Sequence, residues 1–485
     1  MYSTQDDTSI EALERILTGA AAAADPWAAE PATTRATVLR TVAKHLDAQA
    51  DVLVALGMKE TALPEARLRG ELVRTTFQLR LFAEVLDDGS YQDVRIDTAD
   101  ARWPMGAPRP DLRRVLEPVG PVLVFAASNF PFAFSGAGGD TAAALAAGCP
   151  VILKAHPGHP ELSAATAGII QDALSDLGAP AGLYSVVFGV EAGRAALTDP
   201  RVCAGSFTGS IAAGRALFDL ANARATPIPF FAEMGSVNPS FVTRAAARAR
   251  GADIAAAFFA SLTASAGQLC TKPGVLVVPE EMLDHLRTQT PPAPSPLLNA
   301  GIQKGYTDSL RALASHDGVT FLLDGGSAFA DPPEATLLTT TVDAVLRDPS
   351  LLAERFGPAG LVVTYRDEDD LVRLARSLDG QLTASLHGED DDDLRDLTRE
   401  LAKRAGRVLW NQWPTGVSVT YAQQHGGPYP ATTHAGSTSV GTAAILRFLR
   451  PVAYQGFPQS RLPEVLRDDA PHPGYRMING KPVSA

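Results

Sequence analysis

Cys270 is the residue whose type and surroundings point most directly to covalent chemistry. It lies in TASAGQLCTKPG, where a polar, glycine-containing segment meets a strand-like run, so its thiol is expected to be accessible. A lone cysteine is nevertheless more often a small buried hydrophobic residue than a nucleophile. This segment alone leaves both interpretations open.

Glu233 is a candidate general base. It follows the apolar run of PIPFFAEMGSVNPSF, which should be buried. An unpaired carboxylate in such a place has a raised pKa that suits proton abstraction. The alternative is a helix-capping or ion-paired acid, because structural ion pairs also perturb carboxylates.

Asn129 offers a neutral hydrogen-bond donor at the end of an expected strand. In VLVFAASNFPFAFSG it follows the buried run and precedes Pro131, where α/β proteins assemble their sites. An amide donor there suits a developing oxyanion. A turn asparagine that stabilises the bend before the proline is the alternative.

Two further segments suit a nucleotide. Lys154 ends the strand-like PVILKAHP, within reach of a ribose hydroxyl or a phosphate, although a surface lysine is the alternative. In FTGSIAAG, Gly209 and Ser210 would open the next helix and direct its backbone N–H groups at an anion. The pattern is weak alone, and the chain contains no GxGxxG fingerprint.

The elements that must position these residues follow an α/β pattern. Residues 10–86 have helical periodicity, and residues 113–127 form two β-rich runs interrupted by Pro118, Gly120 and Pro121. Helix-like and strand-like runs then alternate, which favours a doubly wound parallel sheet. A second alternating region begins near Asn238 and predicts a second α/β domain. The proline-rich residues 290–296 should be a surface excursion.

Composition excludes several classes of protein. A net charge of -12 over 485 residues disfavours a nucleic-acid or anionic-membrane surface. Three cysteines without CxxC spacing suggest neither a disulfide framework nor a zinc site. The acidic start of the chain is unlike a signal peptide, so the cytoplasm is expected. The acidic residues 389–393 are interpreted as a solvated helix start, and no metal is expected.

Taken together and in order, these segments resemble the aldehyde dehydrogenase superfamily over nearly the whole chain. SNFPFAF is similar to its asparagine segment, VILKAHP to its adenosine-ribose strand, and FTGS to its pyrophosphate turn. AEMGSVNP is similar to its general-base motif, GQLC to its nucleophile segment, and ERFGPAG to its nicotinamide-ribose segment.

The resemblance implies roles for these residues. Cys270 would be the nucleophile, Glu233 the base, and Asn129 the oxyanion donor together with the Cys270 backbone N–H. Gln268, next to the nucleophile, is grouped with them. The implied cofactor contacts are Lys154, His156, Ser128, Gly209, Ser210, Gly235, Glu354, Phe356 and Arg194.

Departures from the family pattern bear on the cofactor. Ser128 stands where many members have tryptophan, and Pro157 stands where many NAD-selective members have glutamate. Without that acid nothing repels a 2′-phosphate, which His156 or Arg194 would then contact. The resemblance therefore predicts NADP as the favoured cofactor, with NAD also accepted.

Substrate choice is expected to depend on side chains near the thiol. KAHPGHP, FAEMGSVNP and SVGTAAILRFLRPVAYQGFP are similar to the α-ketoglutaric semialdehyde dehydrogenases and to related NADP-preferring fatty-aldehyde enzymes. A long-chain aldehyde is thus the alternative substrate, and a CoA-acylating enzyme and a non-catalytic relative are the rival classes. The pocket candidates, which could equally be packing residues, are Phe132, Phe134, Leu269, Thr271, Trp413 and Thr415.

The fold implied by the resemblance has three parts. A Rossmann-like cofactor domain would comprise residues 1–104 and 121–239, with a return of the chain at 431–450. An α/β catalytic domain would span residues 240–430. A hairpin at 105–120 and the tail at 451–485 would form a small β element for assembly into a homo-oligomer, either a dimer or a tetramer.

Overall fold

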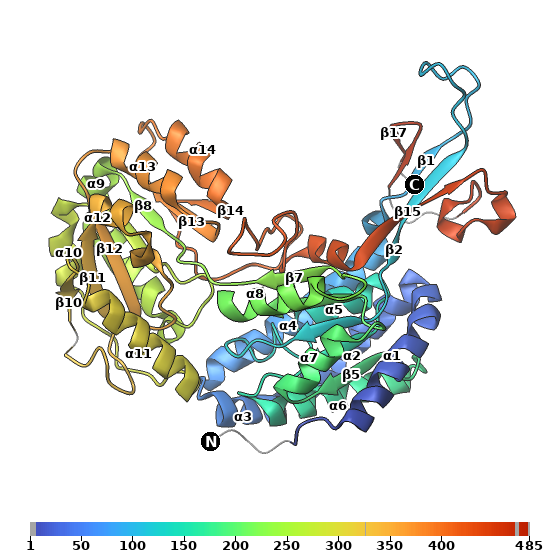
Figure 1. The fold of residues 1–485 in the computed structure, drawn as a ribbon, viewed down its shortest axis with the longest axis horizontal. Coiled ribbons are helices and arrows are strands. Elements are labelled where there is room, and N and C mark those ends of the chain that lie inside the picture. Colours follow the sequence, from blue (N-terminus) through green and yellow to red (C-terminus); the bar gives the residue numbers. More distant parts are fainter. Residues whose placement is uncertain (1–5, 325, 471–474, 484–485) are drawn as a thin grey trace.

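The computed structural model describes residues 6–324, 326–470 and 475–483. The helical periodicity of the opening segment is confirmed by four helices (Figure 1). The second to fourth pack on one face of the cofactor sheet, whereas the first packs largely on the opposite face. Parts of the predicted first and last segments, residues 1–5, 471–474 and 484–485, lie outside the described residues. The opening helices are α1 (Ile10–Ala29), α2 (Ala32–Ala48), α3 (Ala50–Thr61) and α4 (Glu65–Asp88).

The first α/β region is a parallel sheet with the strand order β5-β4-β3-β6-β7. Its order reverses at β3, from which the chain proceeds first to β4 and β5 and later, on the other side, to β6 and β7. Ligands of open α/β sheets bind beyond the carboxyl ends of the strands at such a switch point. The elements are β3 (Val122–Phe125), α5 (Gly139–Ala147), β4 (Val151–Lys154), α6 (Pro160–Asp176), β5 (Tyr184–Val187), α7 (Val190–Thr198), β6 (Ala204–Thr208), α8 (Ile211–Asn222) and β7 (Phe230–Glu233).

The second α/β region has the strand order β10-β11-β12-β9-β8-β13-β14 and is parallel except for the β10–β11 pair. It confirms the second alternating pattern. Its strands are β8 (Ser240–Val242), β9 (Val275–Pro279), β10 (Thr320–Leu323), β11 (Thr336–Thr341), β12 (Ala359–Tyr365), β13 (Gln381–His387) and β14 (Ala405–Trp410). Its helices are α9 (Arg244–Thr263), α10 (Leu283–Arg287), α11 (Ala300–Ala314), α12 (Val342–Arg347), α13 (Asp369–Ser377) and α14 (Arg395–Arg404).

A separate sheet, with the order β15-β2-β1-β16-β17, forms an arm that projects from the body (Figure 1). It joins segments from the two halves of the chain, since β2 pairs antiparallel with both β1 and β15. Strand β1 precedes the boundary at residue 105 but belongs to this sheet. The strands are β1 (Arg95–Asp97), β2 (Leu112–Pro118), β15 (Leu449–Gln455), β16 (Arg476–Ile478) and β17 (Lys481–Val483).

Two short segments around the site lack regular α or β structure. The 3-10 helix η2 (Ala264–Gly267) precedes Cys270, and η4 (Pro349–Leu352) precedes Glu354. Residues 411–441 return from β14 towards the cofactor sheet and end at the 3-10 helix η5 (Thr442–Phe448). Among the described helices, none is both long and apolar enough to cross a membrane.

Candidate active site

A cavity of about 490 Å³ lies where the two α/β regions meet. It extends from the switch point of the cofactor sheet to the Cys270 thiol, so one space joins the predicted nucleotide turn to the predicted nucleophile. The predicted site residues that line it are Ser128, Asn129, Phe134, His156, Gly209, Ser210, Glu233, Gly235, Cys270, Glu354 and Phe356.

The loop that carries Cys270 adopts a conformation that only a specific sequence allows. Ser265 and Ala266 have φ of 53° and 52°, and Gly267 follows with φ of 69°. A Cβ on Gly267 would lie 2.1 Å from the Gly357 carbonyl oxygen, so glycine is required for the close approach of these two segments. Such local backbone strain is common where a site must be held in one geometry.

Asn238 holds the far side of the same loop. This fully buried residue has φ of 47°, and its Nδ2 donates to the carbonyl oxygens of Cys270 at 2.8 Å and Lys272 at 2.9 Å. Its Oδ1 accepts from the hydroxyls of Ser236 at 2.9 Å and Thr383 at 2.8 Å. The backbone of the nucleophile is thus fixed from two strands of the catalytic sheet.

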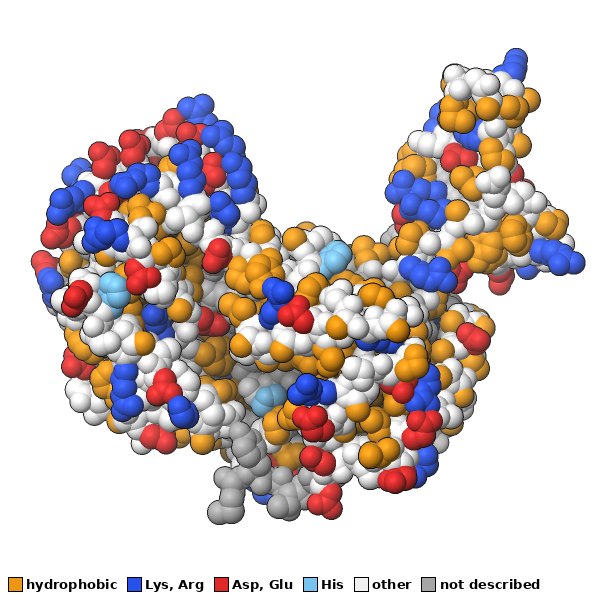
Figure 2. Space-filling view, viewed as in Figure 1, with side chains coloured by type: hydrophobic (Ala, Val, Ile, Leu, Met, Phe, Trp, Pro, Cys, Tyr) orange, Lys and Arg blue, Asp and Glu red, His pale blue; other side chains and the backbone are white. Residues whose placement is uncertain are grey.

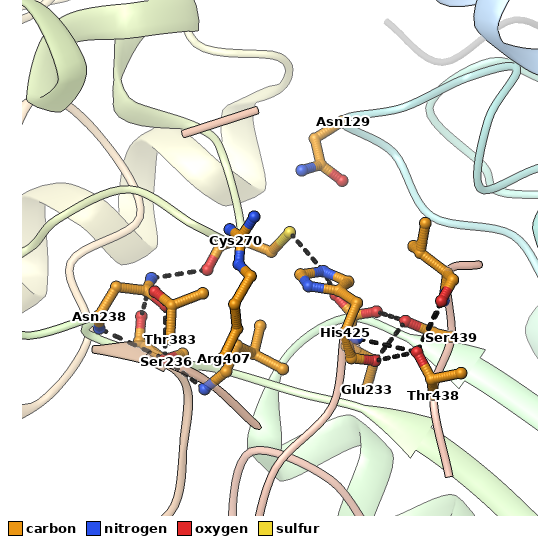
Figure 3. A network of polar contacts seen from close by, with 12 residues as sticks. Asn129, Glu233, Ser236, Asn238, Cys270, Thr383, Arg407, His425, Thr438 and Ser439 are labelled. Atoms are coloured by element: carbon orange, nitrogen blue, oxygen red, sulfur yellow. Dashed lines mark hydrogen bonds and ion pairs between the residues drawn. The ribbon is translucent and has the colours of Figure 1, made fainter. Parts of the chain in front are cut away.

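The thiol faces a histidine and a carboxylate (Figure 3). Cys270 Sγ lies 3.5 Å from His425 Nε2, and the same nitrogen lies 3.0 Å from Glu233 Oε1. The other carboxylate oxygen, Oε2, accepts a short hydrogen bond from the Ser439 hydroxyl. His425 Nε2 donates to the ionised Glu233 and so cannot also accept the thiol proton, which can pass to Glu233 itself through the hydrogen bond that Cys270 and Glu233 share.

His425 is a functional candidate that the sequence analysis missed. It is fully buried, its backbone N–H donates to Thr438 Oγ1 at 2.8 Å, and its carbonyl accepts from the Ser439 N–H at 2.8 Å. It lies 155 residues after Cys270 in a segment without regular structure, so no sequence spacing connects the two. The histidine between two polar glutamines and two glycines in QQHGG was the only available signal.

The partners of Glu233 correct the predicted direction of its pKa shift. Burial favours the neutral acid, but the His425 ring and hydrogen bonds from His425, Ser439 and Cys270 outweigh it, so the pKa of Glu233 lies below its ordinary value. The predicted raised pKa is wrong because the carboxylate is partnered. Burial and the negative charge of Glu233 instead raise the pKa of the Cys270 thiol well above its usual value.

Asn129 lies on the other side of the thiol, at the end of β3 (Figure 3). One Nδ2 hydrogen donates to the Gln268 carbonyl oxygen at 3.0 Å, which leaves the second hydrogen of this amide for an oxyanion. Gln268 itself is buried, and its side-chain Oε1 accepts from the Leu298 N–H at 2.8 Å. The Gln268 side chain therefore anchors a neighbouring loop instead of facing the cavity.

The turn at Gly209 and Ser210, beside the switch point of the cofactor sheet, has the geometry that an anion requires. Ser210 is the N-cap of α8, and its hydroxyl accepts from the Ala213 N–H at 3.3 Å. Gly235 presents bare backbone, since a Cβ there would lie 2.5 Å from a Glu354 carboxylate oxygen. These features fit a phosphate and a ribose against the turn.

Three predicted nucleotide contacts differ in their surroundings. Burial lowers the pKa of His156 to about 3, so its ring is neutral, and its Nδ1 accepts from the Gly158 N–H at 3.0 Å. The remaining ring nitrogen then carries the proton. Lys154 and Arg194 are not among the residues that line the cavity. Lys154 is buried and donates to the Ala155 carbonyl at 2.8 Å, whereas Arg194 is exposed on α7, 3.8 Å from Glu191.

The substrate-pocket candidates are only partly brought together. Phe134 lines the cavity, whereas Phe132 is buried in the core beneath it. Trp413 packs on His387 with ring centroids 4.3 Å apart, and the Thr415 hydroxyl contacts Ser261 at 2.7 Å. Leu269 and Thr271 flank the nucleophile but are also not among the lining residues.

Among the described residues, the donor atoms of Glu233, Cys270 and His425 lie within 4.8 Å of one another and form the one cluster with the composition of a metal site. Thiolate, imidazole and carboxylate are ligands that Zn²⁺ prefers. The same atoms are already partnered with each other and with Ser439. We therefore interpret the cluster as a hydrogen-bonded network that serves proton transfer.

Comparison with known proteins places this site in a family. Residues 2–431 match the aldehyde dehydrogenase family. This chain belongs to that family. The resemblance noted in the sequence is thus confirmed, and the protein is an oxidoreductase that acts on the aldehyde group.

Two curated relatives are similar to this aldehyde dehydrogenase over most of their length. It is 44% identical over 481 residues to alpha-ketoglutaric semialdehyde dehydrogenase 2 of Azospirillum brasilense, covering 97% of this chain and 91% of the relative. It is 43% identical over 460 residues to alpha-ketoglutaric semialdehyde dehydrogenase of Acinetobacter baylyi, covering 92% of this chain and 86% of the relative.

Solved structures confirm the predicted fold class. The succinic semialdehyde dehydrogenase of Streptococcus pyogenes, solved in complex with NADP+, superposes with a TM-score of 0.77 at 17% identity over 93% of this chain and 96% of that one. NADP-dependent glyceraldehyde-3-phosphate dehydrogenase of Bacillus halodurans, complexed with NADP, gives a TM-score of 0.77 at 22% identity over 92% of this chain and 91% of that one.

Proposed function

We propose that this aldehyde dehydrogenase oxidises 2,5-dioxopentanoate, the α-ketoglutaric semialdehyde, to 2-oxoglutarate. The reaction is supported by the cluster of Cys270, His425 and Glu233 facing the same cavity as the nucleotide turn. The choice of aldehyde is supported by the relatives of this name at 44% and 43% identity.

The cofactor is proposed to be NADP, with NAD accepted. The turn at Ser210 and the bare backbone at Gly235 fit it, and two proteins of the same fold were solved with NADP. Glu354 and Phe356 would face the nicotinamide ribose of the cofactor. The neutral His156 ring would donate its N–H to the adenosine part. When bound, the nicotinamide supplies an acceptor for the hydride of the aldehyde carbon.

The first chemical step forms a bond between Cys270 Sγ and the aldehyde carbon. The raised pKa keeps the thiol protonated at neutral pH, so Glu233, which shares a hydrogen bond with the thiol, takes the proton as the bond forms. His425 Nε2, 3.0 Å from Glu233 Oε1, holds this carboxylate in place. The carbonyl oxygen becomes an oxyanion that accepts from Asn129 Nδ2 and the Cys270 backbone N–H.

Hydrolysis of the resulting thioester completes the reaction. A water attacks the acyl carbon, and its proton passes to Glu233. The C–S bond breaks, the thiolate leaves and recovers a proton, and the carboxylic acid is released. A CoA-acylating enzyme needs no such base, so the buried Glu233 favours hydrolysis.

The remaining proposals concern the setting of the enzyme. All three cysteines are free, which supports function in a reducing compartment such as the cytoplasm. The projecting arm supports assembly into a homo-oligomer. We keep the predicted division at residues 105, 121, 240 and 431, with β1 (Arg95–Asp97) added to the arm.

The test is an assay of reduced nicotinamide by absorbance, with NADP or NAD and a panel of aldehydes. We expect the highest kcat/KM for 2,5-dioxopentanoate with NADP, independent of CoA, and no turnover by Cys270→Ser. A preference for long alkyl aldehydes would contradict the proposed substrate, and a requirement for CoA would contradict hydrolysis.

A further inference from the structure

A half-buried arginine near the thiol forms no ion pair among the described residues. Arg74 lies on α4 (Glu65–Asp88), and its Nη1 is buried without a hydrogen-bond partner in the described part of the chain. A buried donor of a charged group without an acceptor is costly, so this nitrogen is expected to have a ligand.

The guanidinium packs on a side chain of the cavity wall, although Arg74 itself is not among the lining residues. Arg74 Cζ lies 5.6 Å from the centroid of the Phe134 ring, and Phe134 lines the same cavity as Cys270 and Glu233. The aromatic face orients a planar guanidinium and leaves its edge available for a carboxylate. Phe134, predicted from the sequence as a pocket residue, thus acquires a role in positioning a cation.

A second arginine on the same helix shows the contrasting, satisfied arrangement. Arg67 stacks over Phe130 at 4.4 Å, donates to Glu71 Oε2 at 2.6 Å and reaches the Asn129 carbonyl at 3.1 Å. Glu71 Oε1 is also committed, because it accepts from the backbone N–H groups of Phe132 and Ala133. The nearby acid is therefore used by Arg67 and by the backbone, and Arg74 is left without it.

The charges near Arg74 include those of the reaction centre. Burial lowers the pKa of Arg74, and the charges of Glu71, of Glu233 and of Cys270 when it is deprotonated oppose that shift, so the guanidinium lies within electrostatic range of the thiol. Glu233 is committed to His425 and Ser439. An anion that enters beside the thiol would meet one uncommitted cation.

We propose that Arg74 binds the carboxylate of the substrate while Cys270 attacks the aldehyde at its other end. This inference rests on the proposed function and names the residue that selects ω-oxo acids over uncharged aldehydes. In 2,5-dioxopentanoate four C–C bonds separate the two groups, a span of about 5 Å when extended. Guanidinium and carboxylate match in a two-pronged hydrogen bond that an uncharged chain end cannot make.

Arg407 is the competing cation. Figure 3 shows its side chain beside Cys270. Burial lowers the pKa of Arg407, and a negative charge on Cys270 opposes that shift. Its Nη2 donates to the Pro414 carbonyl at 2.7 Å and its Nη1 to the Gly416 carbonyl at 3.4 Å. Arg407 thereby holds the loop at 414–416, whereas Arg74 Nη1 donates no hydrogen bond to any described residue.

The experiment compares substrates of equal length, 2,5-dioxopentanoate and pentanal, in wild type and in Arg74→Met. We expect kcat/KM for the acid to fall about a hundredfold and that for pentanal to change less than about threefold. Arg74→Lys should recover part of the preference. Arg80→Met, on the same helix but paired with the exposed Asp47, is the matched control and should behave as wild type.

A binding measurement separates this role from activation of the thiol. Bound 2-oxoglutarate should protect Cys270 of wild type from iodoacetamide, and Arg74→Met should lose that protection relative to its own rate without ligand. The charge of Arg74 lowers the pKa of the thiol, so the free variant should itself react more slowly than wild type. Equal loss of kcat/KM for both substrates, protection by 2-oxoglutarate that persists in Arg74→Met, or loss of preference in Arg407→Met instead would overturn the inference. If wild type itself does not prefer the acid, the proposed substrate fails independently of Arg74.

Discussion

At the scale of single residues, the site depends on how charge is shared among Cys270, His425 and Glu233. The carboxylate is stabilised in its ionised form by its partners, and this same negative charge keeps the thiol protonated. The resting site is thus protected from non-specific thiol reactions, which require the thiolate. The thiol becomes reactive when Glu233 takes its proton and the aldehyde is in place.

Glu233→Gln should separate thiol reactivity from hydrolysis. Removing the negative charge lowers the pKa of Cys270, so more thiolate is present and iodoacetamide should react faster at pH 8 than with wild type. In the same variant the steady-state rate should fall, because the water has lost its base, while a hydride burst remains. An unchanged pH profile of alkylation would show that Glu233 does not act on the thiol.

His425→Gln should affect the step before hydride transfer. Without the ring nitrogen that holds Glu233 at 3.0 Å, the base is no longer fixed beside the thiol, so thiol attack slows and we expect the burst rate to fall by about 10²- to 10⁴-fold. Stopped-flow absorbance measures this rate. The exposed His434, in the same segment, provides a control substitution, His434→Gln, which should leave the burst unchanged.

At the scale of elements, the two halves of the site are joined by contacts between loops. Lys272 is buried two residues after the nucleophile, and its ammonium donates to the carbonyl oxygens of Arg355, Gly357 at 3.1 Å and Ala359 at 3.0 Å. The segment that carries Glu354 and Phe356 is thus fixed to the loop of Cys270. Burial raises the pKa of Glu354, and the charge of Lys272 opposes that shift.

Lys272→Met should therefore weaken cofactor binding more than it changes the thiol. Its removal leaves three buried carbonyls without a donor, so we expect the KM for NADP to rise at least about tenfold and the free energy of unfolding to fall by about 2–4 kcal/mol. Kinetics and thermal denaturation measure the two effects. Lys304→Met, at a surface ion pair with Asp308, should change neither.

At the scale of the whole molecule, the arm is the part that the active site does not explain. It has a small core of its own, made of Val94, Ile96, Val115, Leu462 and Leu466, and it projects clear of the body. Figure 2 shows apolar side chains gathered on it. Its exposed apolar residues Trp103, Met105, Phe457 and Tyr475 indicate a surface that another subunit covers.

Light scattering should accordingly give a mass in solution that is a multiple of 50.9 kDa. Met105→Asp places a charge on the exposed tip of the arm, where the side chain is 74% accessible, so it should weaken assembly without disturbing the core. A matched change on the helical layer, Val73→Asp, should leave the mass unchanged. A monomeric wild type would contradict the proposed assembly.

The sequence by itself determined the elements and most of the catalytic residues. Periodicity predicted the opening helices and both α/β regions, because local hydrophobic pattern and turn residues dictate secondary structure. The segments around Cys270, Glu233 and Asn129 predicted a covalent site, and the structure brings all three to one cavity. These features are encoded within short stretches of chain.

Only the tertiary structure decided the properties that depend on distant partners. His425 is brought to the thiol from 155 residues away, and it reverses the expected pKa shift of Glu233 because a partnered carboxylate differs from a merely buried one. The ion pair between Arg67 and Glu71, which leaves Arg74 Nη1 without a partner among the described residues, likewise cannot be predicted from the sequence. Burial and hydrogen-bond pairing belong to the packed chain, since they depend on which surfaces meet.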